Sequence, residues 1–176
     1  METNQIAYEK ILNLLHEYNP WWRNIDSHVP EYRTKLFYNL CAELDSPSIE
    51  IVYGPRQVGK TVLMKQFIQY LIEDVKTSPY NIMYISMDHT SIDLLCSEPV
   101  NDVIDIYLKY IRPTNTGKVY ILLDEIHTIN NWSSYLKQFY DLGYQFKFIV
   151  SSSSSTEIEK GSSESLIGRA RLRLML

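Results

Sequence analysis

The residues whose types and spacing most clearly suggest chemistry form one loop sequence in the first half of the chain. Residues 54–61 read Gly-Pro-Arg-Gln-Val-Gly-Lys-Thr, which fits the phosphate-loop pattern of Gly, four residues, Gly, Lys and then Ser or Thr. Glycines permit the tight path of such a loop, and its inward-facing amides meet a helix N-terminus whose partial positive charge favours phosphate. The pattern therefore predicts that one run of residues binds a nucleotide: Gly54, Pro55, Arg56, Gln57, Val58, Gly59, Lys60, Thr61 and Val62.

Two side chains of this loop have specific predicted roles. Lys60 can reach the β- and γ-phosphates, and the hydroxyl of Thr61 can bind Mg²⁺. We assign Arg56 to the packing of the loop. The alternative is a Gly-Pro turn that is followed by a lysine without any phosphate site. An apolar run over residues 49–53 and a helical pattern over residues 62–75 place the match between a strand and a helix, which favours the phosphate site.

A pair of carboxylates follows a second apolar run. Residues 119–123 lack polar alternation, as in a strand that is buried on both faces of a parallel sheet, and Asp124 and Glu125 come directly after them. Ligands bind at the carboxyl ends of such strands, so both carboxylates should lie at the same edge as the phosphate loop. We expect Asp124 to hold Mg²⁺, directly or through water. We expect Glu125 to orient or deprotonate an attacking water molecule, against the alternative of a solvated acidic strand end.

Two further residues join Lys60 and Glu125 as catalytic candidates. Ser151 follows the apolar run 146–150 at the same edge, where its hydroxyl could bind the attacking water; a flexible turn is the alternative, which we prefer for residues 153–155. An arginine near a γ-phosphate can raise the rate by about 10³- to 10⁵-fold. Strand alternation places Arg169, Arg171 and Arg173 on one face, and a solvated basic face is the commoner outcome. Arg169, directly after a glycine, is the best candidate of the three.

Helices and strands alternate along the elements that would position these residues. Apolar spacing predicts helices over residues 4–18, 30–44, 62–75, 99–111 and 131–142, and strands over residues 49–53, 81–87, 119–125, 146–150 and 169–176. Residues 156–168 should form a short helix or loop. We expect Pro30 in the first turn of the second helix, Asn131 as the cap of the last one and Gly143 as its stop. The alternation predicts an α/β fold.

Trp21 and Trp22 have two possible interpretations. One of them could stack on an adenine ring, because their flat faces are of similar size. The other interpretation is that a tryptophan pair after a helix stop packs the N-terminal helix against the main domain, and we favour this structural role. We divide the chain into an N-terminal helical extension over residues 1–47 and a nucleotide-binding core over residues 48–176.

Composition narrows the classes of protein that the chain can represent. The chain has 176 residues, 45% hydrophobic and 22% charged, which suits one soluble globular domain. Its net charge of −4 gives no general attraction to nucleic acid or to an anionic membrane. No apolar run approaches a membrane span, and the first residues lack the basic start of a secretory signal. Cys41 and Cys96 have no metal-ligand spacing, which indicates reduced thiols in a cytoplasmic protein.

These segments together resemble one protein family. Residues 54–61 are similar to its GPRxVGKT loop, and residues 123–127, followed by Asn131 and Trp132, are similar to its DEIQ…W segment, with His127 in place of Gln. Residues 165–169 resemble its ESLxGR segment, and residues 19–22 resemble a recurrent NPWW. Over essentially its whole length the chain thus resembles the archaeal and bacterial AAA-type ATPases, whose ATPase domain is usually followed by a C-terminal domain of unknown function.

The resemblance implies a phosphate-loop fold of the additional-strand, catalytic-Glu type, with a five-stranded, mainly parallel sheet of order 5-1-4-3-2. It also implies ATP as the nucleotide. Two departures stand out. Residues 151–153 are all serine where the family usually has Thr-Gly-Ser, which changes the geometry around Ser151. Family members also continue past the GR segment, so we expect a fragment whose C-terminal domain is missing.

We therefore predict the ATP-binding domain of an Mg²⁺-dependent ATPase, with ATP and ADP as ligands and hydrolysis driving a conformational change. The alternative is a nucleotide-binding switch with little or no turnover that regulates a missing DNA- or protein-binding C-terminal domain. A small-molecule phosphotransferase ranks last, because it needs a lid and a set of acceptor-binding arginines that the sequence does not show. An oligomer could supply an arginine in trans. The basic stretch over residues 169–173 is too thin to predict nucleic acid binding, and no membrane partner is expected.

Overall fold

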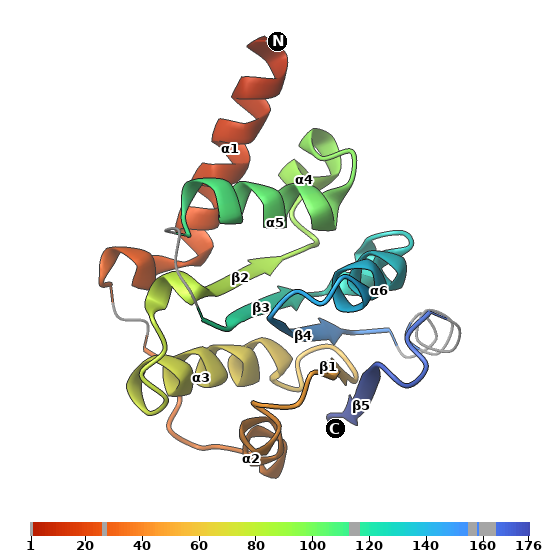
Figure 1. Cartoon of the computed structure of the whole chain (residues 1–176). Coiled ribbons are helices and arrows are strands. Elements are labelled where there is room, and N and C mark those ends of the chain that lie inside the picture. Colours follow the sequence, from red (N-terminus) through yellow and green to blue (C-terminus); the bar gives the residue numbers. More distant parts are fainter. Residues whose placement is uncertain (1, 26–27, 113–116, 155–157, 159–164) are drawn as a thin grey trace.

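The computed structural model describes residues 2–25, 28–112, 117–154, 158 and 165–176. One parallel sheet runs through the molecule, with helices on both sides of it (Figure 1). Helices α1, α4 and α5 gather beyond strand β2, whereas α2 and α3 lie on the side of β1 (Figure 1). Among the described residues, no helix is both long and apolar enough to cross a membrane.

The sheet has five strands in the order β2-β3-β4-β1-β5. This is the predicted order 5-1-4-3-2 read from the other edge, and every pair is parallel. The α/β prediction is therefore confirmed, and the carboxyl ends of all strands meet at one edge of the sheet. The strands are β1 (Ile49–Tyr53), β2 (Ile82–Ser86), β3 (Val119–Asp124), β4 (Phe146–Ser152) and β5 (Ala170–Leu174).

The helices largely follow the predicted ranges. They are α1 (Glu2–Tyr18), α2 (Lys35–Ala42), α3 (Lys60–Glu73), α4 (Thr90–Leu95), α5 (Pro99–Tyr110) and α6 (Trp132–Asp141), together with short 3₁₀ turns over Pro20–Arg23, Pro79–Asn81 and Ile126–Thr128. Helix α4 was not predicted, because six residues are too few to show a helical period. The prediction for residues 156–168 falls mostly outside the described residues.

The predicted start of the second helix is wrong. Pro30 does not open α2; the helix begins at Lys35, and the side chain of the extended Thr34 accepts a hydrogen bond from the Phe37 amide. The carbonyls of Pro30 and Tyr32 instead accept hydrogen bonds of 2.6 and 2.7 Å from the Gln66 side chain on α3. This segment therefore runs along α3 in a non-helical conformation.

The ends of α6 confirm one expectation and correct another. Gly143 follows the helix with φ +72°, which is the left-handed stop that was predicted. Asn131 stands at the cap position, but its backbone is left-handed (φ 57°) and its side chain makes no capping hydrogen bond. Position alone therefore predicted the helix boundary correctly, whereas the capping contact is not made.

Trp21 and Trp22 pack the N-terminal segment onto the sheet. Their side chains are buried, and both indole N–H groups donate to the carbonyl oxygen of Ile82 on β2, at 3.2 and 2.9 Å. Trp22 also stacks on Tyr107 of α5, with 5.7 Å between ring centroids. This is the structural role that we favoured from the sequence.

A buried ion pair joins two interior strands of the sheet, and an arginine from the edge strand β5 extends it. Lys147 Nζ on β4 lies 3.3 Å from Glu50 Oε1 on β1, and neither side chain is exposed. Arg173 on β5 reaches the other oxygen of Glu50 at 2.9 Å, and Arg171 pairs with Glu43. Burial lowers the pKa of Lys147, although Glu50 opposes that shift. Arg171 and Arg173 are therefore each paired with a glutamate, and of the two only Arg171 is exposed, so the expected solvated basic face is formed only in part.

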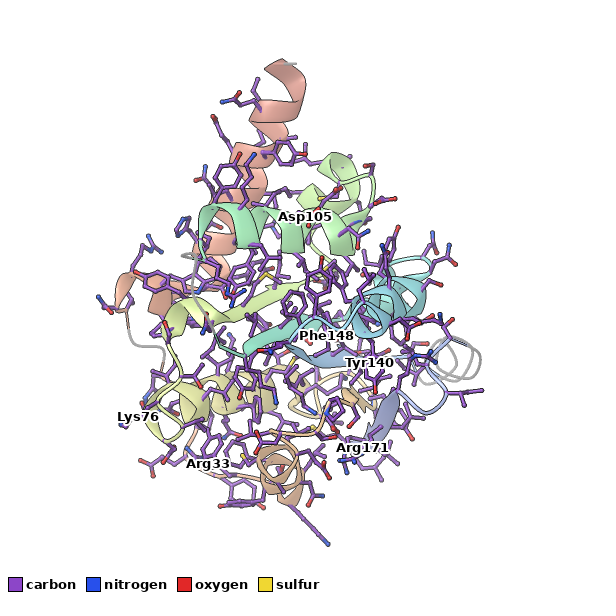
Figure 2. All side chains as sticks on the ribbon, in the orientation of Figure 1. Arg33, Lys76, Asp105, Tyr140, Phe148 and Arg171 are labelled. Carbon is purple, nitrogen blue, oxygen red and sulfur yellow. The ribbon has the colours of Figure 1, made fainter. Side chains whose placement is uncertain are left out.

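Side chains fill the space between the sheet and the helices, as Figure 2 shows around Phe148. Lys76 and Arg171, labelled in the same view, are exposed.

The two cysteines are half-buried, and burial raises the pKa of Cys41 to about 11 and that of Cys96 to about 12. Both therefore stay protonated near neutral pH and are poor nucleophiles.

Candidate phosphate-binding site

The predicted phosphate loop connects β1 to α3. Helix α3 is 14 residues long and begins at Lys60, and Gly59 stands at its cap position with φ +99°. The amides of the first helical turn have no partners within the helix, and the helix dipole gives this end a partial positive charge. Residues 55–57 at the rim of the loop are exposed, Arg56 among them, and Val62 on α3 is exposed as well. Arg56 is therefore not a packing residue, which corrects the assignment made from the sequence.

Gly54 is required by a contact that the loop pattern does not reveal. A Cβ atom at this position would lie 1.9 Å from the carbonyl oxygen of Met175, just after β5. The amide of Met175 also donates to the carbonyl of Tyr53 at 2.8 Å. The backbone that follows β5 thus passes directly against the start of the phosphate loop, where no side chain fits.

Lys60 carries a buried charge inside the loop. Its side chain is 4% exposed, and its ammonium group donates to the carbonyls of Gly54 and Pro55 at 2.9 and 2.7 Å. Among the described residues, no carboxylate lies within ion-pair distance of this ammonium. Because a buried charge without a counter-charge is costly, the position suits an anionic ligand.

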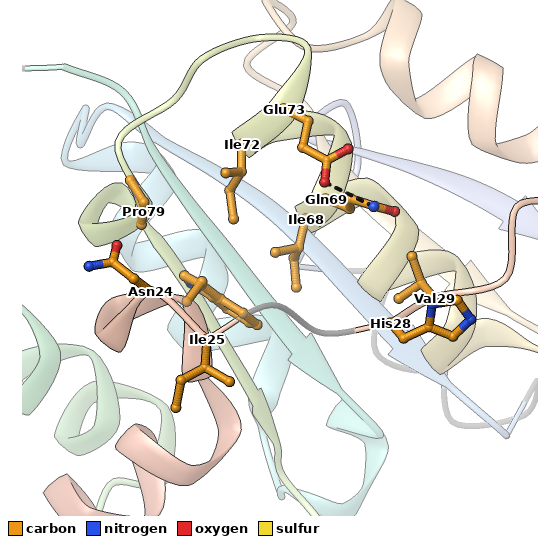
Figure 3. A pocket seen from close by; sticks show the side chains of 10 residues that line it. Asn24, Ile25, His28, Val29, Ile68, Gln69, Ile72, Glu73 and Pro79 are labelled. Atoms are coloured by element: carbon orange, nitrogen blue, oxygen red, sulfur yellow. Dashed lines mark hydrogen bonds between the residues drawn. The ribbon is translucent and has the colours of Figure 1, made fainter.

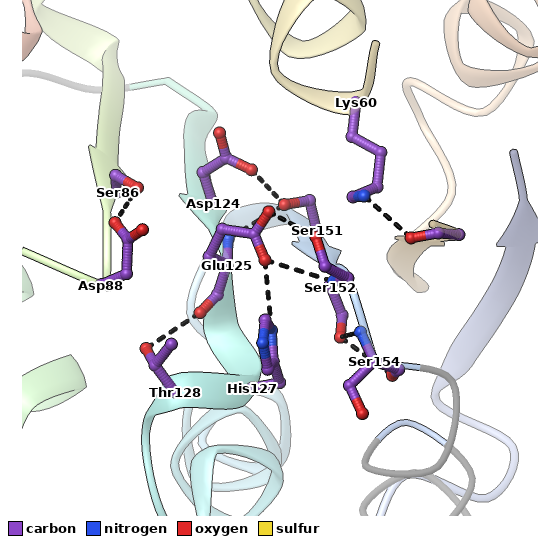
Figure 4. Close-up of polar contacts among 12 residues, drawn as sticks. Lys60, Ser86, Asp88, Asp124, Glu125, His127, Thr128, Ser151, Ser152 and Ser154 are labelled. Atoms are coloured by element: carbon purple, nitrogen blue, oxygen red, sulfur yellow. Dashed lines mark hydrogen bonds and ion pairs between the residues drawn. The ribbon is translucent and has the colours of Figure 1, made fainter. Parts of the chain in front are cut away.

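Three hydroxyl groups from three elements converge on Asp124. Thr61 of α3 donates to Oδ2 at 2.6 Å, and Tyr84 of β2 donates to the same oxygen at 2.9 Å. Ser151 of β4 donates to Oδ1 (Figure 4). Asp124 is only 2% exposed. Burial and the neighbouring Asp124 charge raise the pKa of Tyr84 far above its usual value, so its hydroxyl remains a donor. A hydroxyl beside a carboxylate is the kind of oxygen pair that suits Mg²⁺.

Glu125 lies beside Asp124 in a different environment. It follows β3 in the left-handed conformation (φ 51°), so the strand ends one residue earlier than predicted. The Ser153 hydroxyl and amide donate to its carboxylate at 2.6 and 3.2 Å. The Glu125 amide donates to Ser151 Oγ at 3.0 Å, and Figure 4 shows Glu125 beside Ser151. His127 Nδ1 is 3.3 Å from Glu125 Oε2, without hydrogen-bond geometry. The Glu125 side chain is 23% exposed, so water can reach it.

The structure thus brings together four of the predicted residues at one edge of the sheet: Thr61, Asp124, Glu125 and Ser151. Lys60, the first residue of α3, lies next to them and directs its ammonium group to the loop carbonyl of Gly54 (Figure 4). Arg169 is not brought to this edge. Its carbonyl accepts from the amide of Ile49 at the start of β1, and its guanidinium pairs with Asp141 at 2.8 Å. Gly54 lies at the opposite end of β1.

Sequence reasoning missed Tyr84 and rejected Ser153. Tyr84 stands opposite Leu122 in the register of β2 and β3, which puts it on the same face as Asp124, two residues farther along. A hydroxyl in an otherwise apolar strand was the available signal. Ser153 was taken for part of a flexible turn, but its two bonds to Glu125 fix it. Ser154 donates its amide to Ser152 Oγ at 3.1 Å, and Ser155 lies outside the described residues.

A separate pocket of about 420 Å³ lies between the 3₁₀ turn at Pro20–Arg23 and the second half of α3 (Figure 3). Trp21, Asn24, Ile68, Ile72 and Pro79 are among its lining residues. In the part of the chain that the structure describes, no residue of the phosphate loop lines it. Both tryptophans bond to Ile82 at the first residue of β2, which is the opposite edge of the sheet from the candidate site, and the pocket is distinct from that site.

Comparison with known protein families and sequences gives consistent matches. A family model described as "AAA domain" matches residues 46–176. The uncharacterized protein MJ1544 of Methanocaldococcus jannaschii is 26% identical over 121 residues, which is 69% of this chain and 24% of that protein. The uncharacterized protein MJ1637 of the same organism is 26% identical over 152 residues, which is 86% of this chain and 30% of that protein. The chain therefore spans less than a third of the length of these curated relatives.

Solved structures share the fold. The Aeropyrum pernix ORC1 protein, solved in complex with DNA, has a TM-score of 0.56 at 16% identity and covers 89% of this chain and 48% of its own. The Saccharomyces cerevisiae Hsp104:casein complex in its extended conformation has a TM-score of 0.60 at 14% identity and covers 93% of this chain and 30% of its own. At these identities the likeness shows the fold alone.

Proposed function

The chain belongs to the AAA domain family, and we propose that it is the ATP-binding domain of an Mg²⁺-dependent ATPase. The observation that carries this proposal is the 2.6 Å contact between the Thr61 hydroxyl and the Asp124 carboxylate, at the N-terminus of α3. It joins the phosphate loop to a buried acid from a different strand. A phosphate-binding turn without nucleotide chemistry has no need of that pairing.

In this proposal the loop and Lys60 bind the phosphates. The ammonium of Lys60 exchanges its two loop carbonyls for phosphate oxygens, and the free amides of the first turn of α3 donate to the same group. Thr61 and Asp124 would hold Mg²⁺, because their oxygens are already adjacent. When bound, the ion neutralises charge on the β- and γ-phosphate oxygens.

Glu125 would act as the base. To do so, its carboxylate must accept a hydrogen bond from a water molecule where it now accepts one from the Ser153 hydroxyl at 2.6 Å. Ser151 would keep the two acids in register, because its hydroxyl contacts both the Asp124 carboxylate and the Glu125 amide. We propose that hydrolysis drives a conformational change in the longer protein of which such a domain forms part. We also keep residues 1–47 as an extension and residues 48–176 as the core.

The proposal is tested by Glu125→Gln, which retains the size of the side chain and removes its basicity. We expect ATP binding close to that of the wild type and phosphate release slower by about 10²- to 10⁴-fold. Glu73→Gln is a matched control, since Glu73 is exposed at the end of α3 and its carboxylate accepts a hydrogen bond from Gln69 on the same helix. Unchanged phosphate release in Glu125→Gln would remove the proposed base.

The second candidate function is a nucleotide-binding switch with little turnover. The observation that favours it is that both carboxylate oxygens of Glu125 already accept hydrogen bonds from Ser153. A switch would bind one ATP per chain and release no phosphate, and the Glu125→Gln substitution would then change nothing. The partner of either function stays open: ORC1 was solved with DNA and Hsp104 with casein, and each of these partners is a property of that protein.

A further inference from the structure

We propose that Tyr84 is a positioning residue for Asp124, and that Asn19 fixes Tyr84 in place. The segment that follows the N-terminal helix then forms part of the support of the metal-binding carboxylate. The inference rests on the proposed function, because it concerns how the same Asp124 is held for Mg²⁺. It adds two residues that lie outside the phosphate loop and the acidic strand end.

The first step is the contact between Tyr84 and Asp124. The phenol oxygen lies 2.9 Å from Asp124 Oδ2, the oxygen that Thr61 also contacts. Tyr84 is 3% exposed and Asp124 is 2% exposed, so solvent does not compete for this bond. Ser151 donates to Oδ1 and Tyr84 donates to Oδ2, so a hydrogen bond to each oxygen fixes the orientation of the carboxylate. Tyr84 therefore holds Oδ2 in place by a contact separate from that of the proposed metal ligand Thr61.

The second step is how Tyr84 itself is held. Strand β2 is an edge of the sheet, so the backbone groups on its outer side need partners. The Asn19 side chain provides them: its Oδ1 accepts from the Tyr84 amide at 2.7 Å, and its Nδ2 donates to the Tyr84 carbonyl at 2.8 Å. The same Nδ2 donates to the carbonyl of Leu15 on α1 at 2.7 Å. Asn19 is fully buried, so one amide group ties α1 to Tyr84.

A buried tyrosine can be purely structural, and the chain offers one for comparison. Tyr107 on α5 is also fully buried, and its hydroxyl donates at 2.7 Å to the backbone carbonyl of Tyr80. Tyr84 and Tyr107 thus lose one buried donor each on substitution by phenylalanine. Of the two, Tyr84 contacts the candidate metal-binding acid and Tyr107 does not, so the pair separates loss of packing from loss of positioning.

The test compares Tyr84→Phe with Tyr107→Phe by titrating fluorescently labelled ADP with Mg²⁺ and with a chelator in its place. We expect Tyr84→Phe to reduce the Mg²⁺-dependent gain in ADP affinity by about tenfold, the scale of partners that orient metal ligands. Tyr107→Phe should keep the wild-type gain, although both substitutions lower the melting temperature. A wild-type gain that survives in Tyr84→Phe would overturn this inference and leave the proposed function standing. A wild type without any gain would overturn both.

The link to the N-terminal segment has its own test. Asn19→Leu keeps the size of the side chain and removes both bonds to Tyr84, so the Mg²⁺-dependent gain should fall by about three- to tenfold. Trp22→Phe is the control, since it loses its bond to Ile82 on the same edge and leaves Tyr84 untouched. The link is supported if Asn19→Leu and Trp22→Phe lower the melting temperature equally and only Asn19→Leu reduces the Mg²⁺-dependent gain in ADP affinity. An unchanged gain in Asn19→Leu would overturn the role assigned to Asn19.

Discussion

Asp124 and Glu125 are neighbours in the chain, yet the two halves of the candidate site to which they belong are built differently. Asp124 ends a buried strand, and hydroxyls from α3, β2 and β4 hold it. Glu125 leaves the strand in a left-handed conformation, and Ser153, in the segment directly after β4, holds its carboxylate. The half that would bind phosphate and metal is therefore fixed by regular elements, whereas the half that would activate water depends on loops.

Because the two halves are held by different elements, substitutions that weaken nucleotide binding should be separable from substitutions that slow ATP hydrolysis. The binding half is already assembled, so nucleotide binding needs no rearrangement of the sheet. The water-activating half needs Glu125 to exchange a serine for water, and its left-handed backbone stores about 1–3 kcal/mol that such a movement could release.

The largest effect should come from Lys60→Ala, which removes the buried cation of the loop interior. Charge-assisted hydrogen bonds are worth about 1.5–3 kcal/mol each, so ATP should bind at least about tenfold more weakly. At about 100 times the wild-type Kd, ATP stabilises the wild type by about 2.7 kcal/mol, and about half of this or more should be lost in Lys60→Ala, measured as a smaller rise in melting temperature with ATP. Lys65→Ala, an exposed lysine farther along α3, is the control. Equal stabilisation of Lys60→Ala by ATP would contradict the assignment.

Thr61→Val should follow, with an effect confined to Mg²⁺. The substitution keeps the shape of the side chain and deletes the hydroxyl that contacts Asp124. We expect the Mg²⁺-dependent gain in nucleotide affinity to fall by about tenfold or more, since even partners that only orient a metal ligand are worth that much. Affinity measured with a chelator should stay the same. Thr61→Ser, which retains the hydroxyl, should keep the gain; a loss there would point to packing instead.

Ser151→Ala should have a moderate effect on both halves, because Ser151 is the residue that connects them. Its loss leaves Asp124 Oδ1 and the Glu125 amide without the Ser151 hydroxyl, which should lower the free energy of unfolding by about 1–3 kcal/mol. Phosphate release and Mg²⁺-dependent affinity should both decrease. Ser152→Ala is the control, since Ser152 is equally buried and its hydroxyl bonds the backbone of Ser154. A change in one half alone would show that Ser151 does not couple them.

Arg169→Ala should have the smallest effect. Its guanidinium pairs with Asp141 at a solvent-exposed position, where ion pairs add little to stability. Phosphate release by the isolated chain should not change, because Arg169 lies at the amino end of the sheet. A drop of about 10³-fold would restore a catalytic arginine, and mixing the variant with Lys60→Ala protein would then tell whether it acts on another copy.

The parts of the site that the sequence predicted are those held by contiguous residues. The loop of residues 54–62 and the strand ending at Asp124 carry their own patterns. The α/β fold followed from the alternation of helices and strands, whereas the sheet order was implied by the family resemblance. Arg169 was chosen as the catalytic arginine because it follows a glycine at the start of the predicted last strand, but a residue at the start of a parallel strand must lie at the opposite edge from the phosphates. Tyr84 and Ser153 act through contacts 40 and 28 residues away, and no spacing rule reports such pairs.

The most direct test of the central claim is a calorimetric titration of ATP into the wild-type chain, with Mg²⁺ and then with a chelator. We expect saturable binding of one ATP per chain that becomes tighter with Mg²⁺. Lys60 would bind phosphate, and the adjacent oxygens of Thr61 and Asp124 would bind the metal ion. Absence of saturable binding at millimolar ATP, or binding that is indifferent to Mg²⁺, would contradict the central claim.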